Sequence, residues 1–182
     1  MGRNKLLVNL NGKPLVRWAV EAALTSDASQ VFVVTGNEVE KIAACLSGLP
    51  VTFVHNPHYR AGLSASLKTG VKALPESVDG VLILLGDMPA ISSALIDKLI
   101  AAFDPDEDRA ICVPVHNGTR GNPVLWARRF FPGILALEGD VGARHLIAEN
   151  GAVICQVEAT DEAPLVDIDT QQALDTYLNR TE

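Results

Sequence analysis

Short apolar runs alternate with helical patterns along almost the whole chain, and this alternation is the feature that most restricts the fold. Residues 30–35, 51–54 and 80–85 are runs of β-branched and aliphatic side chains bounded by Gly, Pro or Asn. Near-continuous apolar runs of this length are typical of strands buried on both faces of a parallel sheet. Apolar residues recur at helical spacing within 15–24 and 95–103. The pattern predicts an α/β fold with a mostly parallel sheet covered by helices on both sides.

The second half of the chain continues the alternation with shorter elements. Further elements are expected as a loop at 105–108, strands at 110–115, 122–126 and 152–157, a turn at 116–121, and helices at 142–149 and 171–178. There is no internal repeat, low-complexity tract or linker in the sequence. All residues from 1 to 182 are therefore predicted to form a single domain.

The charge and composition of the chain restrict the kinds of partner that it can bind. The net charge is −7, from 15 Lys and Arg against 22 Asp and Glu, whereas a nucleic-acid-binding protein needs a concentrated basic face. No apolar run approaches the ~20 residues that cross a bilayer, and no leader pattern is evident. The widely separated Cys45, Cys112 and Cys155 are typical of a reducing compartment. The sequence thus predicts a cytoplasmic protein with no nucleic-acid or membrane partner.

One carboxylate directly follows a predicted buried strand. Asp87 comes after the run 80–85, with Gly86 before it and Pro89 two residues later. Ligands of open α/β sheets bind at the carboxyl ends of the strands, and Mg²⁺ prefers one or two carboxylates together with substrate phosphates. Gly86 would let the backbone approach a ligand closely. Asp is also a common turn residue, so the spacing is equally compatible with Asp87 only starting a turn.

A second acidic element lies near the end of the chain. Asp167 and Asp169 are two residues apart and would share one side of an extended segment. Asp169 is followed three residues later by Gln172, a spacing more typical of a helix cap. Asp167 is the better metal-ligand candidate of the two.

Two glycine-containing segments could bind phosphate or sugar groups. Gly62, Ser64 and Ser66 lie at a predicted helix start, where backbone amides and hydroxyls can bind a phosphate, although Ser64 could equally cap its own helix. In the second segment, Asp140 could cap a helix and pair with Arg144. Alternatively, the Arg144 guanidinium could bind an anionic substrate.

Several motifs together resemble a known family. They occur in the family's order and extend from one end of the chain to the other: Met1-Gly-Arg-Asn-Lys5, Gly12-Lys-Pro-Leu15, residues 56–66, Gly86-Asp-Met-Pro89, Arg120-Gly-Asn-Pro-Val124, Gly139-Asp-Val-Gly-Ala-Arg144 and Asp167-Ile-Asp-Thr170. The chain resembles the MobA-like NTP transferase family, most closely its molybdenum cofactor cytidylyltransferase branch. The resemblance implies a three-layer α/β/α sandwich of the nucleotide-diphospho-sugar transferase type.

The same resemblance implies an activity and a set of site residues. CTP would react with the molybdenum-molybdopterin cofactor in the presence of Mg²⁺, giving the cytosine dinucleotide cofactor and pyrophosphate. Asp87 would be the principal metal ligand and catalytic residue, Asp167 the second ligand, and Lys5 the catalytic cation on the triphosphate. Nucleotide or substrate binding would fall to Asn56, Gly62, Ser66, Gly86, Asn122, Asp140 and Arg144.

Two other functions are compatible with these motifs, and the sequence differs from the family's pattern in one respect. The chain could use GTP or another nucleoside triphosphate, or it could be a non-catalytic accessory protein that holds the cofactor for a molybdenum hydroxylase. Family members carry a buried strand and a Leu-Ala-Ala-Gly-x-Ser-x-Arg loop before the Met-Gly segment, whereas the printed sequence begins at Met1. The resemblance therefore implies that the central strand and its glycine loop are missing from the printed sequence, through a misplaced start site or a trimmed chain. If the chain is complete as printed, nucleotide affinity and stability should both be lower.

Overall fold

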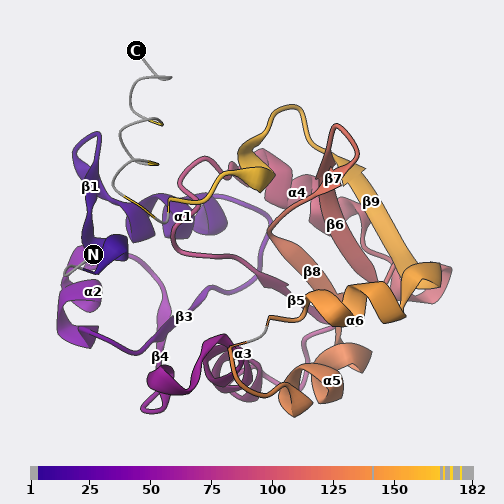
Figure 1. Cartoon of the computed structure of the whole chain (residues 1–182), viewed down its shortest axis with the longest axis horizontal. Helices are drawn as coiled ribbons and strands as arrows, with labels where there is room; N and C mark the ends of the chain where they lie inside the picture. The colour runs from indigo at the N-terminus through magenta and orange to yellow at the C-terminus, as the bar shows by residue number, and fades with distance from the viewer. Residues whose placement is uncertain (1–3, 141, 169, 171–172, 174–176, 178–182) are drawn as a thin grey trace.

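The computed structural model describes residues 4–140, 142–168, 170, 173 and 177. The helices are α1 (Leu15–Leu24), α2 (Val39–Cys45), α3 (Leu63–Lys72), α4 (Ser93–Ala102), α5 (Phe131–Ala136) and α6 (Arg144–Glu149). The strands are β1 (Asn9–Leu10), β2 (Lys13–Pro14), β3 (Phe32–Thr35), β4 (Thr52–His55), β5 (Gly80–Ile83), β6 (Ile111–His116), β7 (Thr119–Arg120), β8 (Val124–Ala127) and β9 (Ile154–Glu158). Figure 1 shows their arrangement. No helix among the described residues is long and apolar enough to cross a membrane.

The strands form a central layer in two parts, with a small hairpin of β1 and β2 beside it. Strands β3 and β4 pair in parallel, and a larger sheet has the order β5-β8-β6-β7, with β9 also paired to β6. Strand β9 is parallel to β6, whereas β8 is antiparallel to both β5 and β6. The sheet is more mixed than the predicted mostly parallel sheet, because the turn between β6 and β7 reverses the chain before β8.

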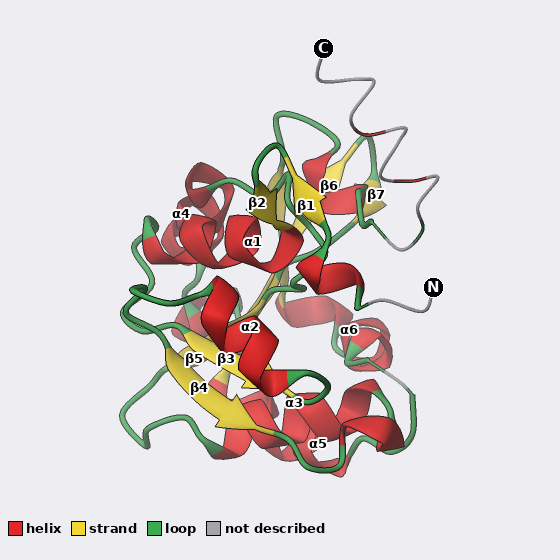
Figure 2. Cartoon of the chain, turned by 90° about the vertical axis from the view of Figure 1, so that its left-hand side faces the viewer, coloured by secondary structure: helices red, strands yellow, loops and turns green. Residues whose placement is uncertain are grey.

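Helices cover both faces of the larger sheet. On one face, Leu95, Ile96 and Leu99 of α4 form a buried cluster with Cys112 and Leu125 of the sheet. A second cluster on the other face joins α3, α5 and α6 to β6 and β8, with Trp126 fully buried in it. Figure 2 shows α1 and α2 on the same side as β3 and β4. The α/β sandwich predicted from the alternating pattern is confirmed.

The helices and strands whose ends were predicted agree with the structure to within two residues at each end. Strand β7 lies inside the predicted turn at 116–121, and three further features were not predicted. Helices α2 and α5 and the β1–β2 hairpin carry little periodic signal. Only Ile42 of α2 is buried, and α5 is short and contains Gly133. Most of the helix predicted at 171–178 lies outside the described residues.

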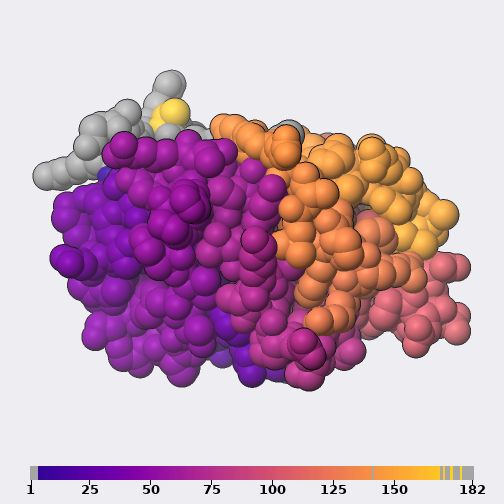
Figure 3. Space-filling view, turned by 90° about the horizontal axis from the view of Figure 1, so that it is seen from below, coloured from indigo at the N-terminus to yellow at the C-terminus, as the bar shows by residue number. Residues whose placement is uncertain are grey.

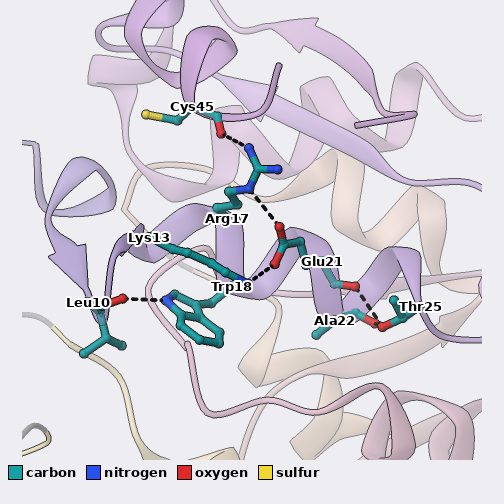
Figure 4. Close-up of polar contacts among 8 residues, drawn as sticks. All are labelled: Leu10, Lys13, Arg17, Trp18, Glu21, Ala22, Thr25 and Cys45. Atoms are coloured by element: carbon teal, nitrogen blue, oxygen red, sulfur yellow. Dashed lines mark hydrogen bonds and ion pairs between the residues drawn. The ribbon is translucent and has the colours of Figure 1, made fainter. Parts of the chain in front are cut away.

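A charge network joins the hairpin, α1 and α2 (Figure 4). Glu21 of α1 accepts hydrogen bonds from Lys13 Nζ at 2.6 Å and from Arg17 Nε at 2.8 Å. The Arg17 guanidinium also donates to the Cys45 carbonyl at the end of α2, at 2.9 Å. Glu21 and Arg17 together therefore link the β1–β2 hairpin, α1 and α2.

We expect Glu21→Gln to lower stability in a pH-dependent way. The hydrogen bonds from Lys13 and Arg17 lower the pKa of the Glu21 carboxyl below its usual range. A lowered folded-state pKa stabilises the fold above the unfolded pKa, and this stability is lost as the pH falls through the folded value. At pH 7 the variant should lose up to ~1 kcal/mol in urea unfolding, since the side chains are partly exposed, and the difference should shrink near pH 3. The exposed Glu40 provides a matched Glu40→Gln control. A difference that stays constant with pH would contradict this explanation.

Candidate active site

Asp87 is a buried carboxylate beyond the carboxyl end of β5. The residue is 8% exposed, and its Oδ2 lies 2.5 Å from the Nζ of Lys5. Its Oδ1 is buried and has no hydrogen-bond partner among the residues that the structure describes. A buried carboxylate oxygen without a partner is energetically costly unless a ligand satisfies it. Asp87 therefore has the environment of a ligand-binding group rather than that of a turn residue alone.

The segment that carries Lys5 packs directly on the strand end. Lys5 lies in the short 3-10 helix η1 (Lys5–Leu7), which Asn4 caps by accepting a hydrogen bond from the Leu6 amide at 3.2 Å. A Cβ placed on Gly86 would lie 3.2 Å from Leu6 Cδ2. Gly86 thus permits the close approach of Leu6, which brings Lys5 beside Asp87. The neighbour of Gly86 in the structure is a protein side chain rather than the ligand that the sequence suggested.

The backbone next to Asp167 is hydrogen-bonded to the backbone of Asp87. The amide of Ile168 donates to the carbonyl of Asp87 at 3.0 Å, and Ile168 is buried while Asp167 is exposed. Asp169 lies outside the described residues. Within residues 4–140 and 142–168, no group of three or more His, Cys, Asp or Glu side chains could hold a metal ion. A cation held here by Asp87 would need oxygen ligands from a substrate as well.

A second part of the site is built around the loop after β4. Asn56 is 1% exposed and bridges the loop, since its Nδ2 donates to Ser66 Oγ at 3.1 Å and its Oδ1 accepts from the His58 amide at 2.9 Å. A Cβ on Gly36, directly after β3, would lie 2.3 Å from Tyr59 Cβ. Gly36 was not among the predicted site residues, although a glycine right after a buried strand is a recognisable signal. Asn56 and Ser66 thus hold the loop between β4 and α3 in place.

We expect Asn56→Ala to destabilise the protein by ~2 kcal/mol. The substitution removes two hydrogen bonds and leaves the His58 amide and the Ser66 hydroxyl without this partner. Urea unfolding with an unchanged m-value would measure the loss. The exposed Asn37 provides a matched control, Asn37→Ala, which should change stability by less than ~0.5 kcal/mol. Equal effects of the two substitutions would show that Asn56 does not hold the loop.

Asp140 reaches across the fold to the start of α3. Its Oδ1 accepts a hydrogen bond from the Leu63 amide at 3.0 Å, and Ser64 Oγ donates to the Gly139 carbonyl at 2.6 Å. Asp140 therefore caps α3, and no ion pair joins it to Arg144, although both residues are described. Ser64 bonds to the distant loop rather than capping its own helix. Figure 3 shows residues near 60–75 directly against those near 125–145.

The remaining predicted residues occupy separate places. Arg144 is the exposed first residue of α6. The amide of Asn122 donates to the Pro164 carbonyl at 2.9 Å, just before β8. Because Val124 pairs with Ile83, Asn122 lies at the edge of the sheet where β5 ends. The structure thus brings Lys5, Gly86 and Asp87 into one group, with Asp167 connected to it only through the Ile168 backbone, and Asn56, Gly62, Ser66 and Asp140 into another.

Comparison with known proteins decides the family. Residues 1–153 match the MobA-like NTP transferase domain. The chain belongs to this family. It is therefore an NTP transferase of the MobA-like type, with the α/β nucleotidyltransferase fold predicted for it.

Individual relatives are similar over different shares of the chain. The purine catabolism protein PucB of Bacillus subtilis is 32% identical over 96% of this chain and 88% of its own length. The molybdenum cofactor cytidylyltransferase of Escherichia coli is 30% identical over 69% of this chain and 62% of its own length. The crystal structure of Rv0371c from Mycobacterium tuberculosis, a complex with manganese, has a TM-score of 0.84 at 19% identity, covering 96% of this chain and 91% of that one. The resemblance to the wider family is confirmed, whereas similarity to the cytidylyltransferase branch is partial.

Proposed function

We propose that this chain transfers CMP from CTP to the molybdenum-molybdopterin cofactor and releases pyrophosphate. The observation that carries the proposal is the buried Asp87 with an unpartnered Oδ1, beside Lys5 and the loop of Asp167. Similarity to a molybdenum cofactor cytidylyltransferase over 69% of the chain supports this choice of nucleotide and acceptor.

The residues around Asp87 fit a divalent cation. Mg²⁺ would be held by Asp87 and Asp167, because hard cations prefer carboxylate oxygens and Asp87 has one buried oxygen that no described residue bonds. When bound, the ion would offset negative charge on phosphate oxygens. The manganese complex of a protein with the same fold supports a divalent-metal requirement.

The remaining site residues would bind and orient two anionic substrates. Lys5 would interact with the triphosphate. The nucleotide or acceptor pocket would be lined by Asn56, Gly62 and Ser66. Arg144 could bind an acceptor anion through its exposed guanidinium.

In the reaction, an acceptor phosphate oxygen forms a bond to the α-phosphorus, the bond from the α-phosphorus to the bridging oxygen breaks, and pyrophosphate leaves with that electron pair. No covalent intermediate with a protein side chain is needed, so positioning and charge are the main contributions of these residues.

The proposal is tested by nucleotide titration and turnover. Thermal shifts are measured with CTP, GTP and ATP, each with and without Mg²⁺, because a ligand at a hundred times its dissociation constant stabilises the native state by about 2.7 kcal/mol. We expect a metal-dependent shift with CTP, and pyrophosphate release only when the molybdopterin acceptor is added. Turnover with GTP instead of CTP would contradict the nucleotide choice. Cofactor binding without pyrophosphate release would indicate an accessory protein.

The acceptor is tested separately. Similarity to a purine catabolism protein covers more of this chain than similarity to the cytidylyltransferase does. Pyrophosphate release with CTP and a different phosphorylated acceptor, but none with molybdopterin, would retain nucleotidyl transfer and overturn the proposed acceptor.

A further inference from the structure

Two cysteines lie opposite each other on adjacent strands of the larger sheet. Cys112 of β6 and Cys155 of β9 are partners in the parallel register of these strands. Neighbouring strands of a sheet lie about 4.8 Å apart. This spacing falls within the range of roughly 4.4–6.8 Å between Cα atoms that a disulfide spans. The register therefore places the two Cα atoms at a separation that a disulfide can bridge.

Both side chains lie on the face of the sheet that α4 covers. Cys112 belongs to the buried cluster on that face, and Cys155 packs against the same cluster, as does Val157 two residues further along β9. The residues on either side of Cys112, Ile111 and Val113, belong to the cluster on the opposite face, as the alternation of side chains along a strand requires. The two sulfur atoms therefore share one apolar layer between the sheet and α4.

Cys112 is the protected member of the pair. It is fully buried, and its Sγ donates to the Arg109 carbonyl at 3.9 Å. Burial, followed by the charge and hydrogen bonding of the neighbouring Cys155 side chain, raises the pKa of the Cys112 thiol to about 12. Because the thiolate is the nucleophilic form of cysteine, Cys112 is a poor first target for an oxidant near neutral pH.

Cys155 is the accessible member of the pair. Its side chain is half-buried, and in the part of the chain that the structure describes its strand pairs only with β6. Figure 1 shows β9 at the outer side of the larger sheet. A small oxidant that approaches from the open edge of β9 therefore meets Cys155 before Cys112, which lies one strand further in.

We propose that Cys112 and Cys155 form an oxidisable dithiol site, which hydrogen peroxide converts into a disulfide between β6 and β9. In the first step, the Cys155 sulfur forms a bond to one peroxide oxygen, the O–O bond breaks, and water leaves, which gives the sulfenic acid of Cys155. In the second step, the Cys112 sulfur forms the S–S bond, the S–O bond breaks, and hydroxide leaves with the Cys112 proton as water. Two thiols and one peroxide thus give one disulfide and two molecules of water.

The disulfide would anchor an edge strand that leads towards the candidate active site. Strand β9 is followed by the 3-10 helix η6 (Ala163–Leu165) and then by Asp167. The next residue, Ile168, donates its amide hydrogen to the Asp87 carbonyl at 3.0 Å. A covalent link at Cys155 would hold the start of this connection to the middle of the sheet. The inference concerns the thiol pair and does not depend on which nucleotide or acceptor is used.

Peptide mapping of the oxidised protein tests the proposal. The folded chain is treated with a small excess of hydrogen peroxide, its remaining thiols are alkylated, and the digest is analysed by mass spectrometry without reduction. We expect one linked species that joins the peptides of Cys112 and Cys155, lighter than their sum by two hydrogen atoms and separated again by dithiothreitol. The half-buried Cys45 is an internal control, since it packs in a different cluster and should be absent from the disulfide.

Three results of this map would overturn the proposal. The first is free, alkylated thiols at both Cys112 and Cys155. The second is a sulfinic acid at Cys155 with Cys112 still free, because the second step would then have failed. The third is a disulfide of the folded chain that contains Cys45. Oxidation of the chain unfolded in guanidinium provides the comparison, since all three pairings become accessible there.

Two variants test the order of the steps. Cys112→Ala removes the thiol of the second step, so peroxide should leave Cys155 as a sulfenic acid that dimedone traps. In Cys155→Ser, Cys112 should escape oxidation and become alkylated only after unfolding. Dimedone bound to Cys112 instead would overturn the proposed first step. If a variant does not fold, the peptide map of the unsubstituted chain decides alone.

Hydrogen exchange measures the effect of the disulfide on the edge strand. We expect backbone amides of β9 to exchange at least ~10-fold more slowly in the oxidised protein than in the same sample after reduction, with those of β3 unchanged. Equal exchange before and after reduction would contradict the anchoring of β9. None of these measurements uses nucleotide turnover, so failure here is distinguishable from failure of the proposed transferase activity.

Discussion

Asp87→Asn should lower kcat/KM for nucleotidyl transfer at least ~10²-fold while leaving the protein folded. The substitution keeps the size of the side chain but removes the charge that pairs with Lys5 and the carboxylate oxygen that has no protein partner. Charged groups that stabilise developing charge at phosphate contribute factors of this size. Pyrophosphate release at saturating Mg²⁺ and at substrate concentrations well below KM measures the loss.

Binding measurements separate this explanation from a general loss of structure. The metal-dependent part of the nucleotide thermal shift should disappear in Asp87→Asn, because the carboxylate needed for the cation is gone. The exposed Asp106 provides a matched control, Asp106→Asn, which should retain full activity. Activity of Asp87→Asn within a factor of two of the wild type would remove Asp87 from the proposed metal site.

The position of Asp87 could be predicted from local sequence because the carboxyl end of its strand follows from the apolar run before it. Its run of apolar residues indicates a buried strand, and the first polar residues after such a strand lie at the sheet edge. The ion pair with Lys5 could not be predicted this way. It depends on the packing of Leu6 against Gly86, a contact between segments 80 residues apart in the sequence.

Long-range hydrogen bonds explain why the arrangement of the second group of site residues, which contains Asn56 and Asp140, was only partly predictable. Spacing suggested that Asp140 caps the helix that follows it, whereas the structure has it capping α3, 77 residues earlier. Local patterns favour nearby partners, since they carry no information about which loops meet in space.

Gly62→Ala should be among the most destabilising single substitutions near the site, at about 3 kcal/mol. Gly62 has φ +100° and ψ −179°, a conformation that essentially only glycine adopts. A Cβ there would lie 2.7 Å from both the Asp140 Cα and the Gly139 carbonyl oxygen. These are backbone atoms, so relief requires the 139–140 loop to move away from α3. Conformational strain and overpacking each contribute roughly 1–3 kcal/mol.

A second glycine separates the two contributions. Gly48 also has a positive φ, +80°, but no atom lies within 4 Å of a Cβ placed on it. Gly48→Ala therefore carries no steric clash and only the cost of a positive φ, about 1 kcal/mol, so urea unfolding should show a clearly larger loss for Gly62→Ala. If Gly62 holds the loop as the structure indicates, Gly62→Ala should also weaken the hydrogen bonds from Leu63 and Ser64 to that loop. Hydrogen exchange at the start of α3 would then rise in Gly62→Ala and stay unchanged in Gly48→Ala. Equal destabilisation of the two variants would mean that the 139–140 loop moves away from the added Cβ at no cost in free energy. The loop would then not position the start of α3.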